Sequence, residues 1–142
     1  MSTPEMGMDT VPKYLGHSYS KWGSNKVAMR KKTLGIWNKY TWDDCYRSVK
    51  YLSLGLMSLG LGWGERVSII GDNCSEWHWI QYAVQAVGGV VVGIFADGSA
   101  QKMKYILDHS DSKFAVVKDQ KQVLGIFEKW TPLRFNILYD FS

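Results

Sequence analysis

The sequence has few cysteines and no secretory start. Cys45 and Cys74 are the only two, which excludes a disulfide-rich scaffold, and their spacing is not that of a metal site. The first ten residues, MSTPEMGMDT, lack the basic start and the apolar stretch of a secretory signal. We therefore interpret both cysteines as free thiols and expect a cytoplasmic protein.

Long apolar runs are missing as well. The longest, from Ala86 to Ala96, is far shorter than the roughly 20 residues that a membrane span requires, so no transmembrane helix is expected. Charge is modest, with a net value of +4 and a sequence pI near 9.0. That surplus allows weak attraction to a nucleotide, to CoA or to an anionic lipid surface. Peripheral contact with the inner face of a membrane therefore stays open.

One short basic run, Arg30 to Lys32, interrupts an otherwise even spread of charge. We interpret it as a solvated hairpin turn rather than as a nucleic-acid or lipid patch, and no nucleic-acid partner is expected. The remaining composition is that of a globular domain, with 142 residues, 46% apolar and 21% charged. A chain of this size is expected to bury one core.

Patterns typical of metal-binding or nucleophilic catalytic sites are also scarce. His17, His78 and His109 are not spaced as metal ligands, and no serine, cysteine or carboxylate is placed to act with one of them as a nucleophile. Cys74 stands near an expected helix start, where the pKa of a thiol can fall, but no basic residue accompanies it. We predict no catalytic, cofactor-binding or metal-binding residue in this chain.

The glycine-rich segment around Gly60, Gly62 and Gly64 differs from a dinucleotide-binding loop in one respect. Such a loop follows a strand and opens a helix, whereas these glycines precede an expected strand. Termination of the preceding helix explains them better. The phosphate loop of nucleoside triphosphatases, G-x-x-x-x-G-K, does not occur either.

Two loops, GDN at 71–73 and FADGSA at 95–100, lie where the carboxyl end of an expected strand meets a helix. Open α/β sheets often bind ligands at this position. Asp72 repels phosphate, however, and Asn73 is explained by capping the next helix, with Glu76 at its third position. We therefore interpret both loops as turns and caps.

Apolar periodicity alternates between strand and helix. Residues 26–30 and 36–41 are typical of a hairpin joined through KKTLG, and Thr41 then caps a helix with Asp43 and Asp44 in its first turn. From residue 66 onward, strand and helix alternate with short turns, which predicts a doubly wound α/β fold with a mostly parallel sheet. Expected strands are 66–70, 90–94, 114–117 and 136–139, and expected helices are 42–59, 73–87, 99–108 and 120–129.

The expected helix around Trp77 has more apolar surface than one sheet can cover. Trp77, Ile80 and Val84 form the stripe expected to face the sheet, and Trp79 and Tyr82 belong to a second stripe beside it. Either these aromatic residues are simply half exposed, or a neighbour covers them. We expect a neighbour over the Trp79/Tyr82 face, either the rest of a longer polypeptide or a separate subunit.

Several stretches of sequence occur together in a distinctive order. They are LGIWNKYTWDD at 34–44, LGLGWGERVSIIGDNCSEWHWIQYAVQAVGGVVVGIFAD at 59–97, and YILDHSDSKFAVVKDQKQV at 105–123. In this combination and spacing they resemble the bacterial long-chain acyl-CoA synthetases of the adenylate-forming superfamily. The segments VPKYL at 11–15 and RFNILYD at 134–140 extend the resemblance over nearly the whole chain.

The resemblance implies an ATP-dependent, AMP-forming ligase. Enzymes of this family convert a fatty acid and ATP to an acyl-adenylate and pyrophosphate, then transfer the acyl group to CoA, with Mg2+ assisting. Their Ser/Thr/Gly-rich phosphate loop ending in Pro-Lys-Gly and the lysine of their mobile C-terminal domain lie downstream of the matched segment. ATP, CoA and Mg2+ are therefore expected of the full-length family and not of this chain, which is expected to be inactive alone.

The resemblance also implies an organisation. Residues 1–20 are expected to form a flexible N-terminal extension and residues 21–142 a truncated N-terminal subdomain of the ligase. Cys74 stands where the family has a basic residue after GDN, and Gly98-Ser99 replaces a bulkier helix start. These departures bear on which substrate is expected and leave the resemblance to the family unchanged.

Two alternatives remain. One is a non-catalytic binding module that pairs with a separately encoded remainder through the Trp79/Tyr82 face. The other is a small flavodoxin-like enzyme that binds a nucleotide at Asp72 or Asp97, against which the missing phosphate-binding loop argues.

Overall fold

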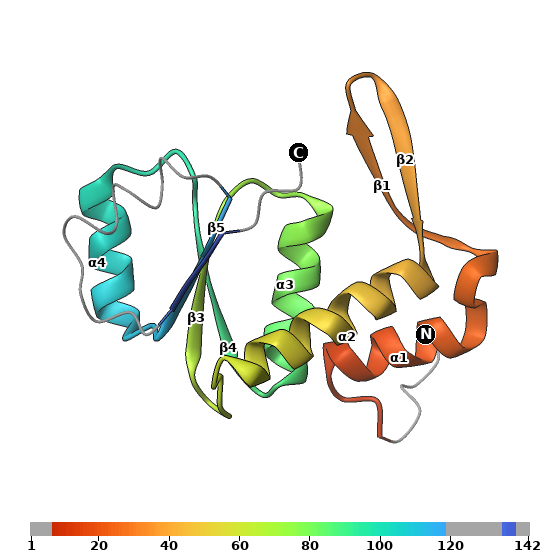
Figure 1. Ribbon diagram of the computed structural model, residues 1–142, viewed down its shortest axis with the longest axis horizontal. Helices are drawn as coiled ribbons and strands as arrows, with labels where there is room; N and C mark the ends of the chain where they lie inside the picture. The colour runs from red at the N-terminus through yellow and green to blue at the C-terminus, as the bar shows by residue number, and fades with distance from the viewer. Residues whose placement is uncertain (1–6, 119–134, 139–142) are drawn as a thin grey trace.

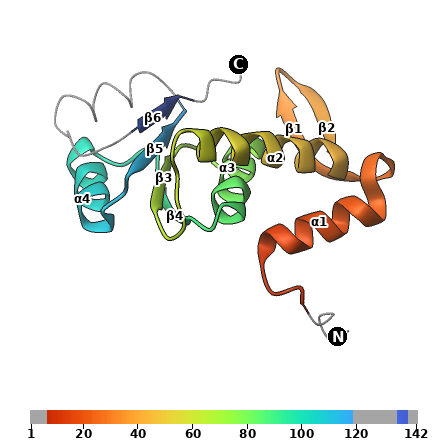
Figure 2. The same ribbon diagram turned by 60° about the horizontal axis from the view of Figure 1, so that its bottom comes forward.

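The computed structural model describes residues 7–118 and 135–138. A sheet forms the middle layer, with helix α4 on one face and helix α3 on the other, while α2 and α1 pack beyond α3 (Figures 1 and 2). A two-stranded hairpin, β1 and β2, projects from the end of the molecule that is far from α4 (Figure 1). The elements are α1 (Val11–Trp22), η1 (Gly23–Asn25), β1 (Val27–Thr33), β2 (Ile36–Thr41), α2 (Trp42–Ser58), β3 (Arg66–Ile70), α3 (Ser75–Ala86), β4 (Val90–Ile94), α4 (Ala100–Ser110), β5 (Phe114–Val117) and β6 (Phe135–Leu138).

The larger sheet is parallel and has the strand order β4-β3-β5-β6. Alternate residues of β3 face opposite layers: Val67 and Ile69 join the core beneath α3, whereas Ile70 joins the core beneath α4. Burial on both faces explains why β3 and β5 are almost continuous apolar runs. The predicted doubly wound α/β fold is confirmed.

Local capping signals define helix α2. The Thr41 hydroxyl accepts a hydrogen bond from the Asp44 amide at 3.2 Å, and the Asp44 carboxylate accepts one from the Thr41 amide at 2.8 Å. At the other end, Gly60 has φ +90° and the Leu61 amide donates to the Leu56 carbonyl at 3.0 Å. Termination by Gly60 is therefore confirmed.

The hairpin turn is tighter than the sequence indicated. Strand β1 continues to Thr33, so only Leu34 and Gly35 connect it to β2, with φ +49° and +84°. Two left-handed residues are typical of a type I′ turn, whose twist matches that of paired strands. The basic run Arg30 to Lys32, which we expected in the turn, instead lies within β1.

Helix α1 corrects the expectation of a flexible extension for residues 11–20. Leu15 is buried, and the ring of Tyr19 stacks on Tyr46 of α2 with centroids 4.2 Å apart. Trp22 contacts Trp42 in a second aromatic pair, with centroids 5.7 Å apart. Packing on α2 therefore orders a segment whose own helix propensity is low.

Near the C-terminus, the expected strand at 136–139 corresponds to β6, which pairs in parallel with β5. Tyr139 and the helix expected at 120–129 lie outside the described residues. Among the described helices, none combines the length and the apolar character that a bilayer span requires.

Candidate functional site

A cavity of about 590 Å3 opens at the carboxyl ends of β3 and β4. Both loops that the sequence placed at strand ends, 71–73 and 95–97, contribute to it, together with the first turn of α3. Trp77 approaches β4 closely, because a Cβ atom added to Gly93 would lie 3.4 Å from Trp77 Cζ2. The lining residues are Gly71, Asp72, Asn73, Trp77, His78, Gly93, Ile94, Phe95, Ala96 and Asp97.

The chemistry of this cavity is aromatic and acidic. Trp77 and Phe95 supply aromatic surface, and Asp72 and Asp97 supply carboxylates, but the described residues that line the cavity include no lysine or arginine. Lys118 pairs with Asp72 at 2.7 Å and so offsets one of the two charges. A triphosphate needs convergent cations and backbone amides, and the described lining supplies no such cations. The interpretation of both loops as turns is consistent with this lining.

The start of α3 differs from the prediction. The N-cap residue is Cys74 and not Asn73, and no side chain caps the helix. Glu76 therefore lies in the first turn, where its carboxylate accepts hydrogen bonds from Lys31 of β1 at 2.6 Å and from Ser75 at 3.1 Å. Long-range pairing with the hairpin replaces the local cap that the sequence suggested.

A second hollow, of about 330 Å3, lies between the hairpin and α3. Among the described residues that line it, Arg30 is the one lysine or arginine, beside His78 and Tyr82. Cys74 also lines it, but burial raises the pKa of the Cys74 thiol, with a smaller contribution in the same direction from Glu76. A raised pKa leaves the thiol protonated at neutral pH, so Cys74 is a poor nucleophile.

The remaining candidate groups stay apart. His78 contacts the rings of Trp77 and Tyr82, and His109 stacks on Tyr105 with centroids 5.6 Å apart. Within residues 7–118 and 135–138, no three His, Cys, Asp or Glu side chains are placed to hold a metal ion. The prediction that this chain holds no catalytic, cofactor-binding or metal-binding residue stays a prediction.

The Trp79/Tyr82 face is not the open surface that we expected. Trp79 is 8% exposed and belongs to the core that α1 and α2 share with α3. Tyr40 of the hairpin contacts its ring edge to face at 5.0 Å. Segments before residue 60 thus cover this stripe, while Tyr82 remains half-buried beside the second hollow.

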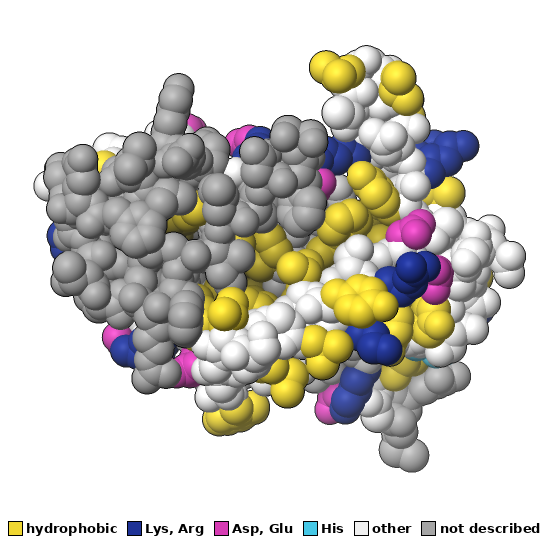
Figure 3. Space-filling model, viewed as in Figure 1, with side chains coloured by type: hydrophobic (Ala, Val, Ile, Leu, Met, Phe, Trp, Pro, Cys, Tyr) yellow, Lys and Arg dark blue, Asp and Glu magenta, His cyan; other side chains and the backbone are white. Residues whose placement is uncertain are grey.

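Two other apolar surfaces are open and were missed from the sequence. One runs along α2, where Tyr51, Leu54 and Met57 are each more than half exposed (Figure 3); we call it the α2 stripe. The sequence does show these apolar residues at intervals of three, next to the buried face of the helix that contains Val49 and Leu56. The other is the tip of the hairpin.

The chain matches the model of the AMP-binding enzyme family over residues 17–140. Among curated proteins, it is 28% identical over 119 residues to the long-chain-fatty-acid–CoA ligase ACSBG2 of Xenopus laevis, covering 84% of this chain and 16% of that protein. The chain thus spans about a sixth of the length of such relatives.

Solved structures share the fold. A putative long-chain-fatty-acid CoA ligase from Rhodopseudomonas palustris aligns with a TM-score of 0.80 at 18% identity, over 97% of this chain and 34% of that one. The N-terminal subdomain of Klebsiella oxytoca NpsA, in complex with 3-hydroxybenzoyl-AMSN, aligns with a TM-score of 0.75 at 16% identity, over 90% and 29%. The family match covers most of the chain and the fold is that of an N-terminal subdomain of adenylate-forming enzymes, so the chain belongs to the AMP-binding enzyme family.

Proposed function

We propose that this chain forms the N-terminal part of a long-chain fatty acid–CoA ligase, which converts fatty acid, ATP and CoA to acyl-CoA, AMP and pyrophosphate. The observation that carries the proposal is the family match over residues 17–140 together with relatives named for this activity. The stretches that carried the sequence resemblance, 34–44 and 59–97, lie inside the matched range.

On its own the chain is expected to be inactive. The described residues that line the cavity at the ends of β3 and β4 include two carboxylates and no lysine or arginine, a lining unsuited to holding a triphosphate in line for attack by a carboxylate. ATP, CoA, Mg2+ and the fatty acid would then be held mainly by the remainder of the ligase, whether that is part of the same polypeptide or of a separate one.

The α2 stripe is the surface that we assign to this remainder, in place of the Trp79/Tyr82 face. Its three side chains lie on one exposed face of a helix whose opposite face is already packed. Apolar side chains gathered on one exposed helix face are a common feature of protein–protein interfaces. Leu54 stands at its centre and is the position at which a charge should disturb docking most.

Reconstitution tests the proposal. The 142-residue chain would be mixed with a relative from which the matched N-terminal segment has been deleted, and fatty-acid-dependent ATP–pyrophosphate exchange would be measured with acids of several chain lengths. We expect no exchange from either piece alone and exchange from the mixture. Exchange by this chain alone, or none from a mixture shown to be associated, would contradict the proposal.

Two matched variants test whether the α2 stripe is the docking surface. Leu54→Glu should weaken reconstitution at least tenfold, because it would bury an unpaired carboxylate in an apolar contact. Tyr105→Glu changes an apolar residue on α4 that is also more than half exposed but lies away from the stripe, and it should leave reconstitution unchanged. Equal effects of both variants would contradict the assignment of the α2 stripe to the interface.

A non-catalytic module is the second candidate, because the α2 stripe would suit any apolar partner equally well. In that case the chain would associate with the remainder, and Leu54→Glu would weaken the association, but no exchange activity would return. Co-sedimentation of the two pieces, measured beside the exchange assay, distinguishes the two functions.

A further inference from the structure

The tip of the β1–β2 hairpin carries a leucine in a conformation that leucine rarely adopts. Leu34 has φ +49° and is 98% exposed. Such a turn favours glycine, which has no Cβ to crowd the backbone, and asparagine, whose short polar side chain can hydrogen-bond locally; leucine has neither advantage. Leucine at this position therefore stabilises neither the turn nor a core, which points to a contact outside the described part of the chain.

The residues beside Leu34 extend the apolar tip. Ile36 and Trp37 are each more than half exposed, and every residue from 32 to 39 is exposed. The lower part of the hairpin, by contrast, is packed: Met29 and Tyr40 contact the core beneath it. The tip thus stands clear of the body on a base that is fixed (Figures 1 and 3).

Charge on the hairpin has one sign. Residues 26–41 contain five basic side chains and no acidic one. Lys31 is paired with Glu76, which leaves four basic residues. Lys32 lies over the Trp37 ring, 5.8 Å from its centroid, close to the apolar tip. Of the four, Lys32 and Lys39 flank the tip, Arg30 lines the second hollow, and Lys26 lies at the base of the hairpin over the Trp22 ring.

We propose that the hairpin is a membrane-contact device, in which Leu34, Ile36 and Trp37 insert into the interfacial region of an anionic bilayer. An apolar tip and a tryptophan suit the boundary between headgroups and acyl chains. Basic side chains just behind the tip are attracted to anionic headgroups, and each one near the surface strengthens binding about fivefold. A purely apolar protein pocket would gain nothing from these cations. The inference does not rest on the ligase proposal.

Vesicle flotation tests the inference with the whole 142-residue chain. We expect binding to vesicles of phosphatidylcholine and phosphatidylserine, weaker binding to phosphatidylcholine alone, and a loss of the difference at high salt. Leu34→Asn should weaken binding to the mixed vesicles about tenfold by removing the inserted side chain. Lys39→Gln should weaken binding about fivefold, and only to the mixed vesicles.

Two controls distinguish insertion of the tip from unfolding of the chain and from nonspecific adsorption of exposed apolar residues to vesicles. Asparagine is favoured in this turn, so Leu34→Asn should melt at the same or a higher temperature than the parent chain. Leu54→Gln removes an exposed leucine from the α2 stripe and should bind vesicles as the parent does. Equal losses for both leucine variants would overturn the inference, as would absence of binding to the mixed vesicles.

A protein contact at the tip gives a different pattern. Leu34→Asn would then lower exchange activity in the vesicle-free reconstitution, while the chain would fail to float with the mixed vesicles. That result overturns the membrane inference and leaves the ligase proposal standing.

Discussion

Lys31 of β1 and Glu76 of α3 form a 2.6 Å salt bridge in which the carboxylate is only 5% exposed and the lysine side chain 29%. The pair ties the middle of strand β1 to the start of a helix 45 residues further along the chain. Because the two partners differ in burial, their removal should have unequal effects.

Lys31→Met should lower the free energy of unfolding by about 3 kcal/mol, since it leaves a buried carboxylate without its cation. Glu76→Gln should cost only about 1 kcal/mol, because Lys31 can turn toward water. Urea denaturation of both variants and of the double variant measures the coupling. Arg47→Gln, which breaks the exposed pair with Asp43, is the control and should cost less than about 0.5 kcal/mol. A Glu76→Gln variant less stable than Lys31→Met would contradict this assignment.

The same pair predicts a dependence on acid pH. Burial opposes ionisation of Glu76, but the hydrogen bond from Lys31 and further hydrogen bonds outweigh it, so the pKa of this carboxyl lies below its ordinary value. A lowered folded-state pKa gives stability that is present above the unfolded pKa, about 4.3, and is lost as pH falls through the folded value. The stability difference between the parent chain and Glu76→Gln should therefore shrink below about pH 4. Denaturation at a series of pH values would reveal a constant difference if the assignment is wrong.

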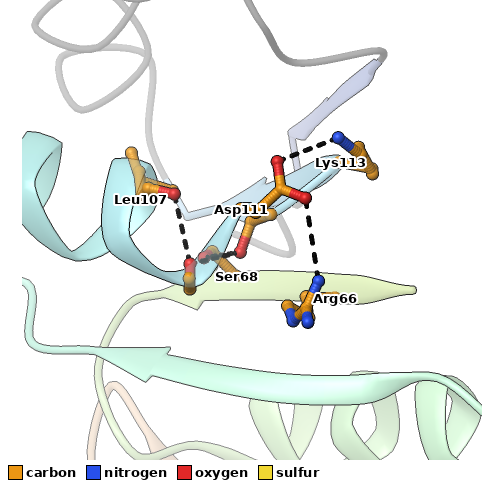
Figure 4. Close-up of polar contacts among 7 residues, drawn as sticks. Arg66, Ser68, Leu107, Asp111 and Lys113 are labelled. Atoms are coloured by element: carbon orange, nitrogen blue, oxygen red, sulfur yellow. Dashed lines mark hydrogen bonds and ion pairs between the residues drawn. The ribbon is translucent and has the colours of Figure 1, made fainter. Parts of the chain in front are cut away.

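Three serines link the end of α4 to strand β3. The hydroxyl of Ser112 lies 2.8 Å from that of Ser68 and 2.8 Å from that of Ser110, and Ser110 also donates to the Leu107 carbonyl at 3.2 Å. Figure 4 shows Leu107 and Ser68 beside this junction, with Asp111 reaching Arg66 and Lys113. Ser112 is therefore the central member of a buried polar chain.

Removal of the central hydroxyl should cost the most. Ser112→Ala leaves the buried Ser68 hydroxyl without its partner and should lower the free energy of unfolding by about 2 kcal/mol. Ser110→Ala should cost about 0.5 kcal/mol, because Ser68 and Ser112 still pair. Thermal melting of the two variants in parallel checks the order, and a larger loss for Ser110→Ala would contradict it.

Local signals predicted much of this fold. The N-caps Thr41 and Ser99 and the glycine at position 60 act through nearby backbone groups, so their effect can be inferred from sequence. The parallel strands β3 and β5 were predictable for a similar reason, since short, almost continuous apolar runs are typical of strands buried on both faces.

Contacts between distant segments were not predictable in this way. Helix α1 contains Gly16, a weak helix former, and is ordered by aromatic pairs with α2. Trp79 looked uncovered because its cover, Tyr40, lies in the hairpin. At the candidate site, the strand-end loops were placed correctly, but the cap of α3 was not, because Lys31 holds Glu76 there.

The turn after α3 leaves no room for a side chain at Gly89. A Cβ atom there would lie 2.9 Å from Val84 Cγ1 and 3.2 Å from the carbonyl oxygens of both Val84 and Glu65. Those carbonyls accept hydrogen bonds from the Gly89 and Val90 amides at 2.9 and 2.8 Å, so they cannot retreat without breaking the helix end and the start of β4.

Gly89→Ala should therefore lower the free energy of unfolding by about 2 kcal/mol, the usual cost of forcing a methyl group against packed backbone. Gly55→Ala provides a control of opposite sign. Gly55 lies within α2, where an added Cβ meets no atom within 4 Å, so alanine should stabilise the chain by up to about 1 kcal/mol through helix propensity. Urea denaturation of both variants measures the two shifts on one scale. Alanine in place of glycine restricts the unfolded chain, which favours folding at both positions, so only crowding can make Gly89→Ala destabilising. Destabilisation by Gly55→Ala, or none by Gly89→Ala, would contradict this assignment.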